Sequence, residues 1–63
     1  MKVIYDQKVD ILRILLGDGD IDESDEEKPG VIIDYDKDGN VVGIEILDAS
    51  QRMNPTALEY AVN

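Results

Sequence analysis

Apolar and polar residues alternate along much of this chain, a pattern that is typical of β-strands with one face in a core. The alternation is strongest in residues 31–36 and 41–47, which flank the turn pair Asp38-Gly39. A two-residue turn there predicts a β-hairpin. It pairs every large apolar residue of one face with another: Val31 with Ile46, Ile33 with Ile44, and Tyr35 with Val42.

A different loop would change that hairpin. A three-residue loop with a glycine bulge moves the pairing by one residue and places Val31 opposite Glu45. We favour the two-residue turn, because a shift of one residue would spoil the match of apolar side chains.

A second hairpin is predicted near the start of the chain. Residues 2–6 and 11–16 alternate, and residues 7–10 form the loop between them. That loop length sets two apolar pairs opposite one another, Tyr5 with Leu12 and Val3 with Ile14. Such pairs stabilise an antiparallel ladder.

The stretch between the hairpins is acidic. Gly17–Asp20 is a turn signal, and residues 21–27 contain one apolar residue, Ile21. This segment is either a third strand anchored by Ile21, with its charges on an exposed sheet edge, or a disordered loop. Pro29 excludes a central strand at its end.

Helical signals begin after the last strand. Asp48 or Ser50 is expected to cap a first helical turn, which Asn54-Pro55 interrupts. Residues 56–59 form a capping-box pattern that starts a second short helix. Its apolar residues are Leu58, Ala61 and Val62, which must dock on the sheet or on a partner.

These elements predict an α+β fold in a single domain, residues 1–63: an antiparallel β-meander of four to five strands with a short C-terminal helix. The sheet has more apolar residues than one face can hide. The second face is expected to carry Ile11, Leu15, Ile32 and Val41. A homodimer or a partner protein that covers this face is therefore predicted.

Size and composition narrow the classes of function. A 63-residue chain buries only about 60% of the surface that it exposes when unfolded, so its stability is marginal. The sequence has no cysteine and no histidine, so it lacks disulfides, thiolate metal sites and the commonest general base. Self-association is the remaining way to add stability.

Charge points to a kind of partner. Fifteen acidic and six basic residues give a formal charge of −9, which repels nucleic acid and anionic membranes. A basic protein is the natural complement, and the acidic stretch 18–27 is its expected contact. The contact residues that we expect are Asp20, Asp22, Glu23 and Asp25.

The expected compartment is the cytoplasm. No apolar run approaches the length of a transmembrane helix. The apolar segment within residues 1–6 is too short for a signal peptide, and it is interrupted early by a charged residue, Asp6.

One segment matches a chemical motif. Asp34, Asp36, Asp38, Gly39 and Glu45 occupy the first, third, fifth, sixth and twelfth positions of a calcium-binding EF-hand loop. An EF-hand also needs a helix on each side of the loop.

The entering segment does not suit a helix. It contains Pro29-Gly30 and then three β-branched residues, which favour a strand. The hairpin is therefore the preferred interpretation, and no cofactor is expected. Weak calcium binding at Asp34, Asp36, Asp38 and Glu45 is the alternative function.

A carboxylate pair could also serve as general acid and base. Asp34 and Glu45 share the second face of the predicted hairpin, as diagonal neighbours on paired strands. A hydrolase would need a deep cleft around them, and a chain of this size without Trp or Phe offers little room. A non-enzymatic protein is therefore expected.

The motifs resemble a family of short prokaryotic proteins known as domain of unknown function 2283. The resemblance rests on Tyr5-Asp6, on Asp10-x-Leu12-x-Ile14, on residues 29–36, and on residues 38–50. It implies a small α+β meander without an established activity. Members of the family often occur beside small predicted toxins, which implies an antitoxin-like role.

Within the shared pattern, Glu45 fits least well as scaffold. A carboxylate in the middle of a strand must face water or a partner such as Ser50, Arg13 or a neighbouring chain.

Overall fold

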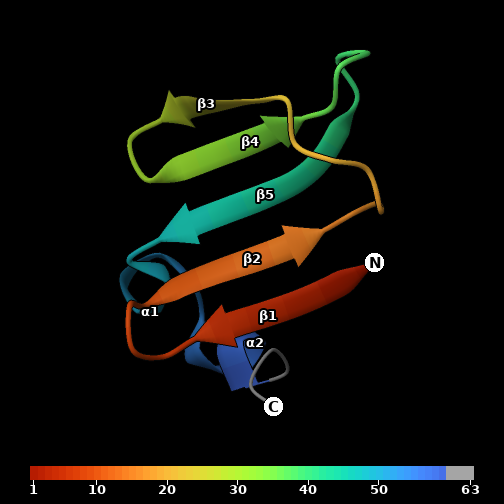
Figure 1. Cartoon of the computed structure of the whole chain (residues 1–63). Coiled ribbons are helices and arrows are strands. Elements are labelled where there is room, and N and C mark those ends of the chain that lie inside the picture. Colours follow the sequence, from red (N-terminus) through yellow and green to blue (C-terminus); the bar gives the residue numbers. More distant parts are fainter. Residues whose placement is uncertain (60–63) are drawn as a thin grey trace.

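A computed structural model describes residues 1–59 of the chain. Its described part is a five-stranded antiparallel sheet with two short helices after the last strand (Figure 1). This confirms the predicted α+β fold. The elements are β1 (Lys2–Asp6), β2 (Ile11–Leu15), β3 (Glu23–Lys28), β4 (Val31–Tyr35), β5 (Val41–Leu47), α1 (Ala49–Arg52) and α2 (Pro55–Glu59).

The strand order across the sheet is β1-β2-β5-β4-β3. The first hairpin, β1–β2, therefore lies beside the last strand of the β3-β4-β5 meander (Figure 1). Residues 16–22 carry the chain past β5 and β4 to the far edge of the sheet. The β1–β2 register is the predicted one, with Tyr5 opposite Leu12 and Val3 opposite Ile14.

The β4–β5 loop differs from the predicted two-residue turn. The backbone N–H of Asp36 donates to the carbonyl of Asn40 at 2.9 Å, and the N–H of Gly39 donates to the carbonyl of Asp36 at 3.0 Å. The loop thus has three residues, 37–39, and Gly39 adopts the positive φ of 83° that such a loop needs.

A compensating bulge restores the register. Tyr35 lies opposite Val41 rather than Val42, and the register then shifts between Tyr35 and Asp34. Val42 is the extra residue of this bulge. The rest of the hairpin therefore keeps the predicted pairs, Ile33 with Ile44 and Val31 with Ile46.

Asp36 organises the loop. Its Oδ1 accepts the backbone N–H groups of Asp38 and Asn40, each at 2.9 Å. The bond from the Asn40 backbone is the main cause that holds the pKa of Asp36 below its usual value. A carboxylate that receives backbone N–H groups in this way stabilises a turn locally.

The acidic stretch is a strand, which decides between the two alternatives left open above. β3 is the outermost strand next to β4, and all six of its residues are exposed. Ile21 does not anchor it, because that side chain lies before the strand and is 53% exposed. Two side-chain bonds tie β3 to β4 instead: Ser24 to Asp34, and Tyr35 to Glu27.

The apolar core lies under the helices. Leu12, Ala49 and Leu58 are buried together on the face that α1 and α2 cover, beside β1, β2 and the end of β5 (Figure 1). Partly buried apolar residues pack around them: Tyr5, Ile14, Ile46 and Met53. Hydrophobic burial is thus concentrated at one end of the sheet.

A residue from the first hairpin caps α1. Asp48 takes the N-cap position with a positive φ of 52°, but its side chain makes no capping bond. Neither expected residue supplies the cap: the Asp10 carboxylate accepts the Ser50 N–H at 3.0 Å and the Ser50 hydroxyl at 2.6 Å. Asp10 also accepts the Tyr5 hydroxyl and, through its carbonyl, the N–H of Ala49. It thereby joins the β1–β2 loop to α1.

The second helix starts two residues earlier than the capping-box pattern predicts. The Asn54 side chain accepts the N–H of Thr56 at 2.8 Å, and α2 begins at Pro55. Asn54 is therefore the N-cap of α2. The capping-box pattern, which made Thr56 the N-cap, was wrong. Leu58 is buried as expected, whereas Ala61 and Val62 lie outside the described residues.

The second face of the sheet carries half-buried apolar residues. Ile11, Leu15 and Ile32 are all partly buried. The prediction for Val41 was wrong: the longer loop and the bulge place it opposite Tyr35, on the core face, where it is 43% exposed. Pairing of two copies through this face stays a prediction, which the molar mass in solution decides.

Candidate functional site

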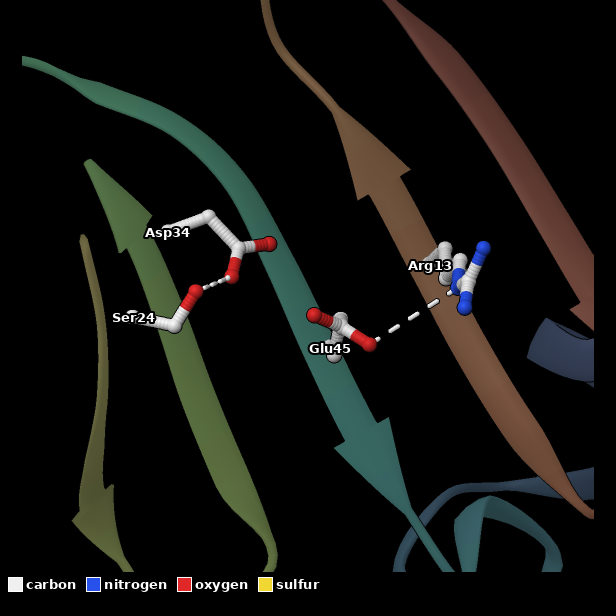
Figure 2. Close-up of polar contacts among 4 residues, drawn as sticks. All are labelled: Arg13, Ser24, Asp34 and Glu45. Atoms are coloured by element: carbon white, nitrogen blue, oxygen red, sulfur yellow. Dashed lines mark hydrogen bonds and ion pairs between the residues drawn. The ribbon is translucent and has the colours of Figure 1, made fainter. Parts of the chain in front are cut away.

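Four polar side chains form a row across the second face of the sheet. Ser24 comes from β3, Asp34 from β4, Glu45 from β5 and Arg13 from β2 (Figure 2). Side chains alternate between the faces of a strand, and the register brings these four to the same side. Figure 2 shows Glu45 between Asp34 and Arg13.

Asp34 is buried although it lies on a sheet face. Its side chain is 2% exposed, and its Oδ1 accepts the Ser24 hydroxyl at 2.6 Å. The residue opposite Asp34 on β5 is Gly43. A Cβ on Gly43 would lie 2.8 Å from Oδ2 of Asp34, so the missing side chain makes the space that the carboxylate fills.

Glu45 meets Arg13 directly across β5 and β2. Its Oε1 lies 3.7 Å from Nε of Arg13, which confirms Arg13 among the partners proposed for this carboxylate. Ser50 is not a partner, because it is bonded to Asp10. The Arg13 side chain is 60% exposed, so this pair contributes little stability.

The pKa of Glu45 is raised above its usual value. Burial is the largest cause, followed by the negative charge of Asp34 and a hydrogen bond from protonated Glu45 to that carboxylate. Arg13 acts in the opposite direction, but it does not cancel the other effects. Glu45 therefore holds a proton more tightly than an isolated glutamate does.

Proton binding alone does not make a catalytic site. Four hollows on the described part of the chain, between about 120 and 380 Å³, are lined by residues other than Asp34 and Glu45. Substrate sites are concave and exclude much of the water from the reacting atoms. We therefore derive no reaction from this pair.

The residues of the calcium pattern are spread over two places. Asp34 and Glu45 lie in the polar row, whereas the Asp36 carboxylate is bonded within the loop beside Asp38. Among residues 1–59, no group of three or more Asp, Glu, His or Cys side chains is placed to hold a metal ion.

The four residues expected to bind a partner lie together at the β3 edge of the sheet. Asp20 and Asp22 are on the loop before β3, Glu23 and Asp25 are on β3 itself, and all four are exposed. The four residues that were grouped by sequence are therefore also neighbours in the fold.

That surface includes residues that the sequence did not connect to it. A hollow of about 380 Å³ lies between residues 19–22 and residues 36–38, and a neighbouring one of about 340 Å³ extends along Glu23, Asp25 and Tyr35. Asp36 and Asp38 thus add two carboxylates to the acidic surface. The antiparallel pairing of β3 with β4 brings the β4–β5 loop beside residues 20–22, and the sequence left open whether the acidic stretch is a strand.

The chain belongs to a protein family. The family model described as "Protein of unknown function (DUF2283)" matches residues 2–50, which include all five described strands and the start of α1. No curated protein matches the chain. No solved structure matches it. Within residues 1–59, the helices are too short to cross a membrane.

We expect Gly43→Ala to destabilise the fold by about 1–3 kcal/mol, because the new methyl group overlaps a buried carboxylate that is already bonded to Ser24. Urea unfolding measures this change. Gly17→Ala is the matched control: a Cβ there meets nothing within 4 Å, so its stability should stay near that of the native chain. Equal stability of the two variants would show that Gly43 is not needed to make space for the Asp34 carboxylate.

The pKa of Glu45 predicts a dependence on pH. Because this pKa is higher in the folded than in the unfolded chain, the folded state binds the proton more tightly, and the stability that this gives is lost as pH rises. The difference in unfolding free energy, native minus Glu45→Gln, should therefore fall as pH rises from about 4.5 towards 7. Urea unfolding of both proteins at several pH values measures it. Carboxylates remote from Glu45 contribute equally to both proteins, and a difference that is constant or rises contradicts the assignment.

Proposed function

We propose that this protein is a non-enzymatic interaction module that binds a small basic protein. Its acidic surface is defined here as Asp20, Asp22, Glu23 and Asp25 with Asp36 and Asp38. The observation that carries the proposal is the position of these residues, which form one exposed surface along the outer strand and the hollows beside it.

Most charges of this surface are available to a partner, although the Asp36 carboxylate also accepts the backbone N–H groups of Asp38 and Asn40. Glu26 accepts the N–H of Gly30 and Glu27 accepts the Tyr35 hydroxyl, so these two carboxylates have roles within the fold. Glu23 and Asp25 have no such bond to residues 1–59. Among residues 1–59, the ion pair is the one between Arg13 and Glu45, and it lies on the second face of the sheet, away from Glu23 and Asp25.

A surface with six carboxylates and one neighbouring lysine, Lys37, favours basic partners in two ways. It accelerates their encounter through long-range attraction, and it repels acidic competitors. Binding of this kind supports an antitoxin-like role in the cytoplasm, in which the module covers the basic surface of a small toxic protein. We propose both the antitoxin-like role and the cytoplasmic location.

Calcium binding remains the alternative, with a specific structural requirement. Asp34 and Glu45 would have to leave Ser24 and Arg13 in order to share an ion with Asp36 and Asp38. No observation favours that rearrangement, so the interaction module is the function that we propose.

Matched charge variants test the proposal. The triple variant Asp22→Asn/Glu23→Gln/Asp25→Asn removes three negative charges from the acidic surface. The control Asp6→Asn/Asp48→Asn/Glu59→Gln removes three from exposed positions elsewhere. Each tagged protein is used to capture proteins from the native host, and any basic protein retained is purified and titrated against all three.

We expect the native chain and the control to bind this protein with similar affinity at physiological salt. The acidic-surface variant should bind at least about tenfold more weakly, because several charge pairs are lost together. Equal loss in the two variants would show that net charge alone matters, and capture of no basic protein by the native chain would also contradict the proposal.

A further inference from the structure

We propose that the basic partner binds by adding a strand to β3. This inference rests on the proposed function and specifies how the acidic surface acts. The partner segment is extended, has Lys or Arg at alternate positions, and hydrogen-bonds to the backbone of residues 23–26.

The backbone of β3 is suited to this. β3 is the outermost strand and pairs on one side with β4, in regular register from Glu23 opposite Tyr35 to Glu26 opposite Ile32. In an antiparallel pair, alternate residues direct both backbone groups towards the neighbour or away from it. The outward groups of residues 23–26 form an open ladder, which is a template for another strand.

The end of the ladder is also defined. The register shifts between Glu26 and Lys28, and Pro29 follows, so regular pairing stops there. Bulges and prolines are features that end pairing at a sheet edge. The available edge is therefore short, and an added strand can dock in few registers.

Charge then selects the strand. Like charges directly opposite one another destabilise a strand pair, and opposite charges contribute about 0.2–1 kcal/mol per pair. β3 has four carboxylates and one lysine among its six residues. Neutral and acidic strands are disfavoured, which protects the chain from pairing with its own acidic edge, whereas a basic strand gains charge pairs.

The alternation of β3 specifies where the basic residues belong. Glu23 and Asp25 pair with Tyr35 and Ile33, so they lie on the core face beside the 340 Å³ hollow. Ser24 and Glu26 lie on the second face. A matching strand has basic residues opposite Glu23 and Asp25, whose long side chains reach the carboxylates around the hollow.

The other edge of the sheet lacks this combination. β1 has one basic and one acidic residue, Lys2 and Asp6, with apolar residues between them. Its two charges have opposite signs, so β1 does not select an incoming strand by charge. The two edges provide an internal comparison in the same molecule.

A synthetic nine-residue peptide of alternating Lys and Val tests strand addition on the full chain. Its control has the same side chains and charge but carries N-methyl groups on alternate backbone nitrogens, which remove hydrogen-bond donors. We expect the unmodified peptide to bind at least about tenfold more tightly, because two or more backbone bonds are lost in the control. NMR hydrogen exchange should show new protection at alternate amides within residues 23–26, and none in β1.

A charge swap provides the second arm. Glu23→Lys/Asp25→Lys should lose the Lys-Val peptide and bind a Glu-Val peptide of the same length. Equal binding of the two Lys-Val peptides, or binding without new amide protection in β3, would overturn strand addition. Loss of affinity in Asp22→Asn/Glu23→Gln/Asp25→Asn would in that case still support the proposed function. Failure of the Lys-Val peptide to bind at all would overturn strand addition alone, because capture of the native partner tests the function separately.

Discussion

The acidic outer strand depends on a partly buried hydrogen bond, the one that Ser24 donates to Asp34. β3 has no apolar side chain to bury, and its carboxylates repel one another. Its backbone ladder to β4 is therefore supported by few side chains, of which Ser24 is the one bonded to a residue that is almost fully buried. Asp34 can occupy that position because Gly43, directly opposite it, has no side chain. A packing feature of the second face thus holds the strand that we propose as the binding edge.

This arrangement separates the stability of the fold from its binding surface. Apolar burial is concentrated around Leu12, Ala49 and Leu58, at the end of the sheet farthest from β3 in the strand order (Figure 1). The acidic edge contributes little to that core, so its charges can be chosen for a partner. Asp34 and Glu45 lie between the two regions, and the raised pKa of Glu45 follows from its burial and from the neighbouring charge of Asp34.

Local sequence patterns were sufficient to predict the two hairpins. They did not predict the contacts between segments that lie far apart in the sequence. Alternation placed Ile33 opposite Ile44 correctly, although the loop was one residue longer than predicted, because the bulge at Val42 cancelled the difference. Two compensating irregularities leave no trace in the apolar pattern. The cap of α1 could not be predicted either, since Asp10 lies 40 residues from Ser50. Four residues of the acidic surface were predicted, but its extension to the β4–β5 loop depends on the pairing of β3 with β4, and the charge pattern did not decide whether the acidic stretch is a strand.

Amide hydrogen exchange in the free chain tests most directly whether Ser24 and Asp34 hold the acidic edge. Ser24→Ala removes the hydroxyl without changing any charge. Loss of a bond worth about 1 kcal/mol should speed exchange of the amides between β3 and β4 roughly fivefold, while the β1–β2 amides keep the protection of the native chain. Unchanged exchange in β3, or an equal increase throughout the sheet, would contradict the account.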